Sequence, residues 1–143
     1  MSRSKRPKQR VALAAVAVFL VAGAAGATSV VRNPTIDERA SIRQAIFDAV
    51  AAKGRPANPA ITRVRVSGVI LSARPGQYRK FARVDLNDPK AGYAGALAGY
   101  YVASISGWKI LDMGSAQVGC SVPAKLFRGK KSAVLLDLKL DCS

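Results

Sequence analysis

The sequence predicts an α+β fold in which one amphipathic helix packs on a four-stranded antiparallel sheet and a disulfide holds the C-terminal tail. Two changes of pattern support this prediction. Apolar residues recur at helical spacing between residues 35 and 53, and they alternate with polar residues in short segments between residues 61 and 113. Two cysteines, Cys120 and Cys142, lie in the C-terminal part. A leader of 27 residues precedes this domain.

The leader has the layout of a secretory signal peptide. Five cationic residues lie within positions 3–10, and an uncharged run from 11 to 27 ends in Ala25, Gly26 and Ala27. The apolar run is expected to enter the membrane during export while its basic end stays on the cytoplasmic side. We expect cleavage after Ala27, with Ala25 and Ala27 in the peptidase subsites. The alternative is an uncleaved membrane anchor, although a span typically needs about 20 apolar residues.

Cleavage leaves a lead-in at 28–34 and a single α+β domain at 35–143. The leader contains five of the 23 Lys and Arg and none of the eight acids, so the rest of the chain has a net charge of about +10. For an exported domain, this charge favours salt-dependent binding to anionic lipid or cell-wall polymer. A protein partner and a simple solubilising role are the alternatives, and no nucleic-acid partner is expected.

The helix is predicted to begin at Thr35 and to end at Lys53. Thr35 and Glu38 have the spacing of a capping box, in which each side chain binds a free backbone N–H of the first turn. Gly54 directly follows and is typical of a helix C-terminus. The apolar face of the helix is formed by Ile42, Ile46, Ala49 and Val50.

Four strands are predicted after the helix, at residues 61–67, 78–86, 100–105 and 108–113. The first is expected to continue through residues 69–71 after a bulge at Gly68, and Ser106-Gly107 is expected to form a tight turn. Residues 92–99 are rich in Gly and Ala and carry no clear pattern. One sheet face is expected to contact water, because charged residues alternate with apolar ones along the strands; they are Arg63, Arg65, Arg83 and Lys109.

The C-terminal tail is predicted to be linked to the domain by a Cys120–Cys142 disulfide. An even number of cysteines in an exported chain favours a disulfide, and closing this loop contributes about 3 kcal/mol in the chain-entropy model. A redox-active pair is the alternative, but such pairs usually have the spacing C-x-x-C. A short helical turn is expected after Pro123, and residues 132–138 fit either a strand or a short helix.

The sequence contains few residues that carry catalytic chemistry. It has no histidine and no cysteine-rich metal motif, so we expect neither an enzyme nor a metal or other cofactor. Trp108 and one of the pair Tyr100-Tyr101 are expected in the core; an aromatic binding platform is the alternative. The best candidates for anion binding are the basic run and a second group of cations, namely Arg128, Lys130 and Lys131 with Arg79, Lys80 and Arg83.

The C-terminal third carries the pattern W…GS…VGC…VP…L…C, formed by residues 108–123 and 138–142. In this pattern the chain resembles small uncharacterised secreted proteins of actinobacteria. The resemblance implies an extracytoplasmic single domain with a Cys120–Cys142 bridge, and it implies no activity.

Together these observations predict an exported, non-enzymatic domain, secreted or attached to the cell envelope, which binds an anionic surface or a protein partner. If the leader is retained, the domain is anchored by a single membrane pass and faces outward. Two alternative functions remain. A cystatin-like protease inhibitor is suggested by the order of helix and sheet and by Gln117-Val118-Gly119 before Cys120. A small-molecule-binding domain would use a pocket between helix and sheet.

Overall fold

The computed structural model describes residues 30–54, 59–88, 90 and 92–143. The predicted leader, with Ala25 and Ala27, lies outside these residues. Within them, no helix is long and apolar enough to cross a membrane. The elements are α1 (Ile36–Ala52), β1 (Ala60–Val66), β2 (Gln77–Asp88), β3 (Tyr93–Val102), β4 (Gly107–Gly114), the 3₁₀-helix η1 (Ala124–Phe127) and α2 (Lys131–Asp137).

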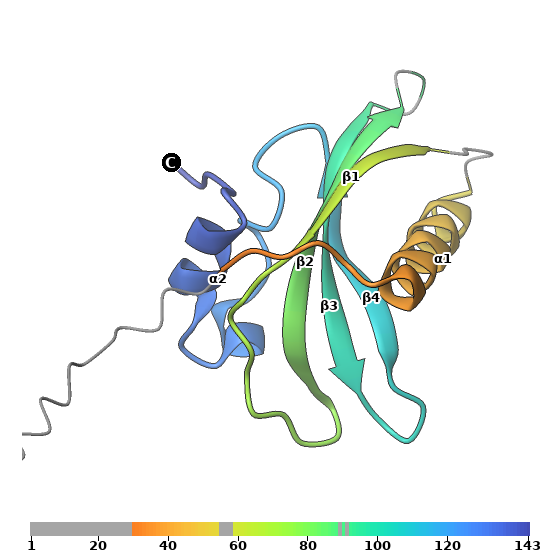
Figure 1. Cartoon of the computed structure of the whole chain (residues 1–143). Helices are drawn as coiled ribbons and strands as arrows, with labels where there is room; N and C mark the ends of the chain where they lie inside the picture. The colour runs from red at the N-terminus through yellow and green to blue at the C-terminus, as the bar shows by residue number, and fades with distance from the viewer. Residues whose placement is uncertain (1–29, 55–58, 89, 91) are drawn as a thin grey trace, which may run out of the picture.

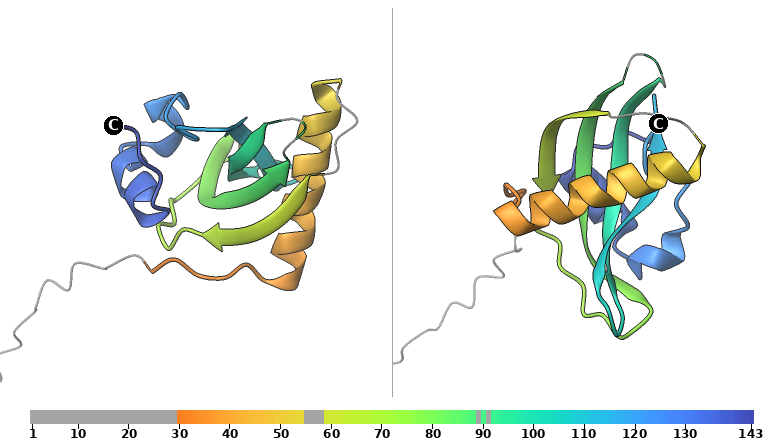
Figure 2. Two further views of the ribbon diagram at one scale, coloured as in Figure 1. Left: turned by 90° about the horizontal axis from the view of Figure 1, so that it is seen from above. Right: turned by 90° about the vertical axis from the view of Figure 1, so that its right-hand side faces the viewer.

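The four strands form one antiparallel sheet in the order β1-β2-β3-β4. Helix α1 crosses one face of this sheet, and η1 and α2 lie on the opposite face (Figures 1 and 2). The predicted α+β class is therefore confirmed. We call these two faces the α1 face and the C-terminal face.

Helix α1 begins at the predicted capping box. The backbone N–H of Glu38 donates to Thr35 Oγ1 at 3.1 Å, and the backbone N–H of Thr35 donates to Glu38 Oε2 at 2.9 Å. The apolar side of the helix is buried against the sheet, as the spacing predicted. This first core contains Ile42, Ala45, Ile46 and Val50 from α1, and Val64, Val66, Ala82, Val84, Leu86, Ala96, Ala98, Trp108 and Met113 from the sheet.

The third strand lies earlier in the chain than predicted. It spans Tyr93–Val102 and includes most of the Gly- and Ala-rich stretch, whereas the sequence placed it at 100–105. Small residues are needed here because both faces of β3 are covered at close range. A Cβ atom added to Gly99 would lie 2.6 Å from Tyr78 Cδ1, so a side chain at this position would displace the tyrosine. Low strand propensity is overridden by this packing.

Two other local predictions were wrong. Strand β1 ends at Val66 and does not resume at residues 69–71, because Asp137 of α2 holds the following segment. Its Oδ2 atom accepts hydrogen bonds from Ser67 Oγ at 2.5 Å and from the N–H of Gly68 at 2.8 Å. The predicted two-residue turn Ser106-Gly107 is also wrong, because β3 ends at Val102 and β4 begins at Gly107, so the connection is longer than two residues.

The alternation along the strands predicted that one sheet face contacts water. The C-terminal face instead covers a second core. Phe127 of η1 stacks on Phe81 of β2 with ring centroids 4.6 Å apart. The segment 132–138, for which the sequence allowed either a strand or a short helix, is helical up to Asp137 and forms most of α2, where Val134 is buried. The predicted disulfide between Cys120 and Cys142 is confirmed. Further members of this core are Leu71, Leu97, Val118, Val122 and Leu138.

Candidate functional site

The six cations predicted to bind anions lie in different parts of the structure. Lys80 lies on the α1 face, where its Nζ atom is 4.9 Å from the Tyr100 ring centroid and 5.5 Å from that of Trp108. Arg83 projects from the opposite face of the same strand and donates to backbone carbonyls near the C-terminus. The six residues therefore do not form one patch.

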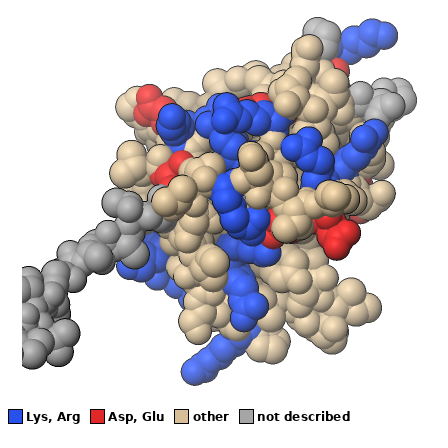
Figure 3. Space-filling model, viewed as in Figure 1, with Lys and Arg blue, Asp and Glu red and all other residues tan. Residues whose placement is uncertain are grey.

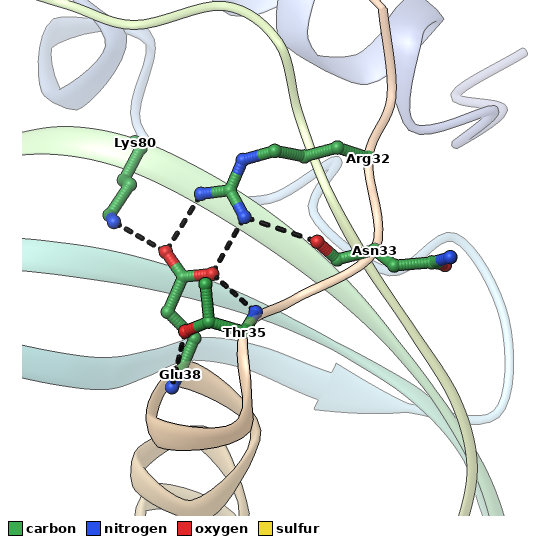
Figure 4. A network of polar contacts seen from close by, with 5 residues as sticks. All are labelled: Arg32, Asn33, Thr35, Glu38 and Lys80. Carbon is green, nitrogen blue, oxygen red and sulfur yellow. Dashed lines mark hydrogen bonds and ion pairs between the residues drawn. The ribbon is translucent and has the colours of Figure 1, made fainter.

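Lys80 is held by a carboxylate at the start of α1 (Figure 4). Its Nζ atom lies 2.6 Å from Glu38 Oε1. The guanidinium of Arg32 donates to both Glu38 oxygens at 2.7 Å, and the N–H of Thr35 completes the network. The Arg32 hydrogen bonds, supported by those from Lys80 and Thr35, hold the pKa of Glu38 far below its ordinary value despite its partial burial. This network fixes α1 to the sheet and neutralises much of the Lys80 charge.

Replacing Glu38 by glutamine is expected to lower the free energy of unfolding by about 2 kcal/mol at pH 7. The folded-state pKa is depressed, so the stabilisation is fully present above the unfolded pKa of about 4.3 and is lost progressively as the pH falls from there through the folded-state pKa. The difference between E38Q and the natural protein should therefore shrink between pH 5 and pH 2 in urea denaturation. The matched control is Asp37→Asn, an exposed acid in the same turn. A difference of the same size at pH 5 and pH 2, or an equal loss in D37N, would contradict the prediction.

Two residues of the basic run are used to hold the fold together. Arg128 has a left-handed backbone (φ 43°), and its guanidinium donates to the carbonyls of Tyr78 at 2.9 Å and Ser72 at 2.6 Å. Lys131 Nζ donates to the carbonyls of Cys120 at 2.8 Å and Val122 at 2.7 Å. These charges are fixed in place, but carbonyl groups do not neutralise them.

An aromatic pair that the sequence did not single out lies beside Arg128. Tyr78 of β2 and Tyr101 of β3 pack on the C-terminal face with ring centroids 5.3 Å apart, and Lys109 of β4 lies 3.9 Å from the Tyr101 centroid. Burial, with a smaller contribution from Tyr101, raises the pKa of Tyr78, so its phenol stays neutral at neutral pH. Tyr100 and Trp108 belong to the opposite face, where Trp108 is buried as predicted.

Tyr78 also borders a hollow on the C-terminal face. This hollow of about 170 Å³ lies between Tyr78 of β2 and two cations of the C-terminal segment, Lys125 and Arg128. In the view of Figure 3, Lys and Arg are more abundant than Asp and Glu, and acidic residues lie beside some of them. We define the basic–aromatic surface by the two tyrosines and the cations beside them, Tyr78, Tyr101, Lys109, Lys125 and Arg128. To these we add three exposed cations that lie within four residues of Tyr78 or Arg128 in the sequence: Arg74, Arg79 and Lys130.

The cations of this surface lack acidic partners. Across the described ranges, the ion pairs involve Arg32, Lys80, Arg65 and Arg83 with Glu38 or Asp85, and none involves a cation of the basic–aromatic surface. Three of the six predicted anion-binding residues, Arg79, Arg128 and Lys130, belong to it. Tyr101 was considered with Tyr100 for an aromatic platform, but Tyr78 was missed, because only the pairing of β2 with β3 brings residues 78 and 101 together.

The residues that suggested the two alternative functions lie outside the basic–aromatic surface. Val118 and Gly119, which suggested an inhibitory loop, are buried, and the N–H of Gly119 donates to Asp112 Oδ2 at 2.7 Å. Between helix and sheet, a hollow of about 350 Å³ lies where Arg43 of α1 approaches Pro59 and the start of β1. Groups of three or more potential metal ligands are absent from the part of the chain that the structure describes.

Comparisons with protein-family models, curated proteins and solved structures find no match for this chain.

Proposed function

We propose that this protein is an exported, non-enzymatic domain that binds phosphate-bearing surfaces of the cell envelope through the basic–aromatic surface. The apolar leader and the resemblance to small secreted actinobacterial proteins support export. The disulfide supports an oxidising, extracytoplasmic compartment. The observation that carries the binding proposal is the group of six cations without acidic partners around a tyrosine pair.

The arrangement of these groups suits a polyanion better than a single small anion. The cations come from the β1–β2 loop, β2, β4, η1 and the η1–α2 connection, so they are spread over a surface and do not converge on one point. Each cation near an anionic surface contributes about 1 kcal/mol at low salt, and the contributions add. Arg128 is already held by two carbonyls, so it loses little conformational freedom on binding.

The tyrosine rings supply a second kind of contact. Tyr78 and Tyr101 are each partly exposed, and their rings carry a polar hydroxyl on an apolar body. Such rings pack on sugar or glycerol units while neighbouring cations contact the phosphates. This combination supports binding to a phosphate-bearing lipid or wall polymer.

Replacing Lys109, Lys125 and Lys130 together by glutamine is expected to weaken binding by roughly 10- to 100-fold at low salt. All three lysines are exposed and form no ion pair with the residues that the structure describes, so the fold should be retained. Binding is measured by cosedimentation of the oxidised protein with phosphatidylglycerol vesicles and, separately, by titration with a poly(glycerol phosphate) polymer. Raising the salt from low to physiological concentration should weaken both interactions by about tenfold or more.

The matched control removes the same charge elsewhere. Arg39, Lys53 and Lys90 are exposed and lie outside the basic–aromatic surface, so their triple glutamine variant should lose much less affinity. Equal losses in the two triple variants would show that net charge alone drives binding and would reject the surface. No binding of the natural protein to vesicles or polymer at low salt would reject the proposed function. The two probes distinguish lipid from polymer as the source of phosphate.

A further inference from the structure

A second hollow lies on the C-terminal face, at the other end of the strands from the basic–aromatic surface. It has a volume of about 260 Å³ and lies between the first half of β3, the segment after β4 and the tail before Cys142. We call it the Gly95 pocket. Its lining combines Gly95, Val118 and Leu140 with the polar side chains of Arg83, Gln117 and Lys139.

Strand β3 carries no side chain at residue 95, which lies in the lining of the pocket. A Cβ atom added to Gly95 would lie 3.3 Å from the Val84 carbonyl oxygen and 3.6 Å from Val118 Cγ2. The backbone of Gly95 does not have a positive φ, so its conformation admits other residues. A Cβ atom 3.3 Å from a backbone oxygen requires the two strands to move apart by a few tenths of an ångström. A larger side chain would therefore both occupy part of the hollow and press on β2.

The walls of the pocket are held in unusual backbone conformations. Gln117 and Lys139 have φ values of 50° and 53°, a left-handed region that residues other than glycine seldom adopt. Both walls lie beside the disulfide, because Gln117 precedes Cys120 and Lys139 precedes Cys142 by three residues. The guanidinium of Arg83 also binds the tail, through the Lys139 carbonyl at 2.7 Å. The walls are therefore preorganised before any ligand enters.

Two cationic side chains that line the pocket, Arg83 and Lys139, have hydrogen-bond donors available to an anionic group of a ligand. Arg83 Nε donates to Asp85 and its Nη1 donates to carbonyls of Leu138 and Lys139, while its Nη2 atom has no partner among the described residues. Lys139 is exposed and forms no ion pair within that same set. The Asp85 carboxylate beside Arg83, and Asp141 in the lining, disfavour a ligand with two negative charges.

We propose that the Gly95 pocket binds a small organic monocarboxylate. The carboxylate lies between Arg83 Nη2 and Lys139, and a short apolar chain packs on Gly95 and Val118. A volume of about 260 Å³ is below the usual range for drug-sized ligands, which points to a ligand of a few carbon atoms. This proposal is independent of the polyanion binding proposed above, because the two sites share no residue.

The proposal is tested by ¹H–¹⁵N correlation spectra of the oxidised protein during titration with three probes. Butyrate supplies a carboxylate and a short apolar chain, butylammonium supplies the chain with the opposite charge, and inorganic phosphate supplies an anion without a chain. Butyrate is expected to shift the amide signals of Gly95, Gln117 and Val118 in a saturable way. The other two probes are expected to bind at least about tenfold more weakly, a difference of about 1.4 kcal/mol.

Two variants that change the pocket in different ways complete the test, so that a folding defect in one does not decide the outcome. Gly95→Val fills the pocket and Lys139→Gln removes one charge, and each should weaken butyrate binding about tenfold or more. Lys130→Gln, on the basic–aromatic surface, should leave it unchanged. The proposal is overturned if butyrate shifts do not saturate, if they centre on Tyr78 and Tyr101, if either other probe binds equally well, or if both pocket variants bind butyrate normally. These outcomes do not affect the vesicle and polymer measurements.

Discussion

Replacing Phe127 by alanine is expected to lower the free energy of unfolding by about 3–5 kcal/mol, the largest effect that we predict for a single residue. Phe127 is fully buried and stacks on Phe81, so its ring joins η1 to the C-terminal face of the sheet. Its removal leaves a cavity between the sheet and η1, close to the residues that precede α2. The measurement is urea denaturation at neutral pH with the disulfide intact.

The matched control for this variant is Leu136→Ala in the same C-terminal segment. Leu136 is 80% exposed, so its truncation should change the free energy of unfolding by no more than about 0.5 kcal/mol. Because Arg128 directly follows Phe127, F127A should also weaken binding to anionic vesicles, whereas L136A should not. A loss below about 1 kcal/mol in F127A would show that the C-terminal segment does not complete the core.

Removing the disulfide by replacing Cys120 and Cys142 together with serine is expected to cost about 3 kcal/mol of stability. The two cysteines are 22 residues apart, and their bridge restricts the unfolded chain over that loop. The loop contains η1 and α2, so the second core depends on the same restriction. The variant should unfold at a lower urea concentration, and its butyrate affinity should fall because the Lys139–Asp141 wall is no longer held.

Chemical reduction of the natural protein provides the control for this substitution. Protein kept reduced by excess reductant should unfold close to the double serine variant, since both lack the bridge and carry small side chains at the two positions. Intact mass of the exported protein before reduction should show no alkylatable thiol and should report whether residues 1–27 have been removed. Two free thiols before reduction, or an unchanged urea midpoint in the variant, would contradict the stabilising role of the disulfide.

The parts of the fold that depend on neighbours in sequence were predicted well. The Thr35–Glu38 capping box is a contact over three residues, and the helix that it begins was located to within one residue at each end. The strand at residues 108–113 was likewise found from its own alternation. Strand β3 was misplaced because its glycines gave no strand pattern. They are glycines because neighbours crowd both positions: Tyr78 of β2 lies against Gly99, and the backbone of β2 and Val118 lie against Gly95.

The candidate site was predicted only in part, for the same reason. Arg79, Arg128 and Lys130 were identified from their charge, but charge alone does not show that Lys80 is held by Glu38 or that Lys131 binds two carbonyls. The role of the tyrosines required the register of β2 on β3. The Gly95 pocket required both the pairing of the strands and the path of the tail.

By itself, the sequence determined the class of the fold, the leader pattern, the position of α1 and the pairing of Cys120 with Cys142. Each of these depends on local periodicity, on composition or on there being two cysteines to pair. Only the tertiary structure decided that the sheet is covered on both faces, which cations are left without acidic partners, and where the two hollows lie. The physical reason is that burial, ion pairing and cavities arise between residues far apart in the chain, such as Phe81 and Phe127 or Gly95 and Lys139.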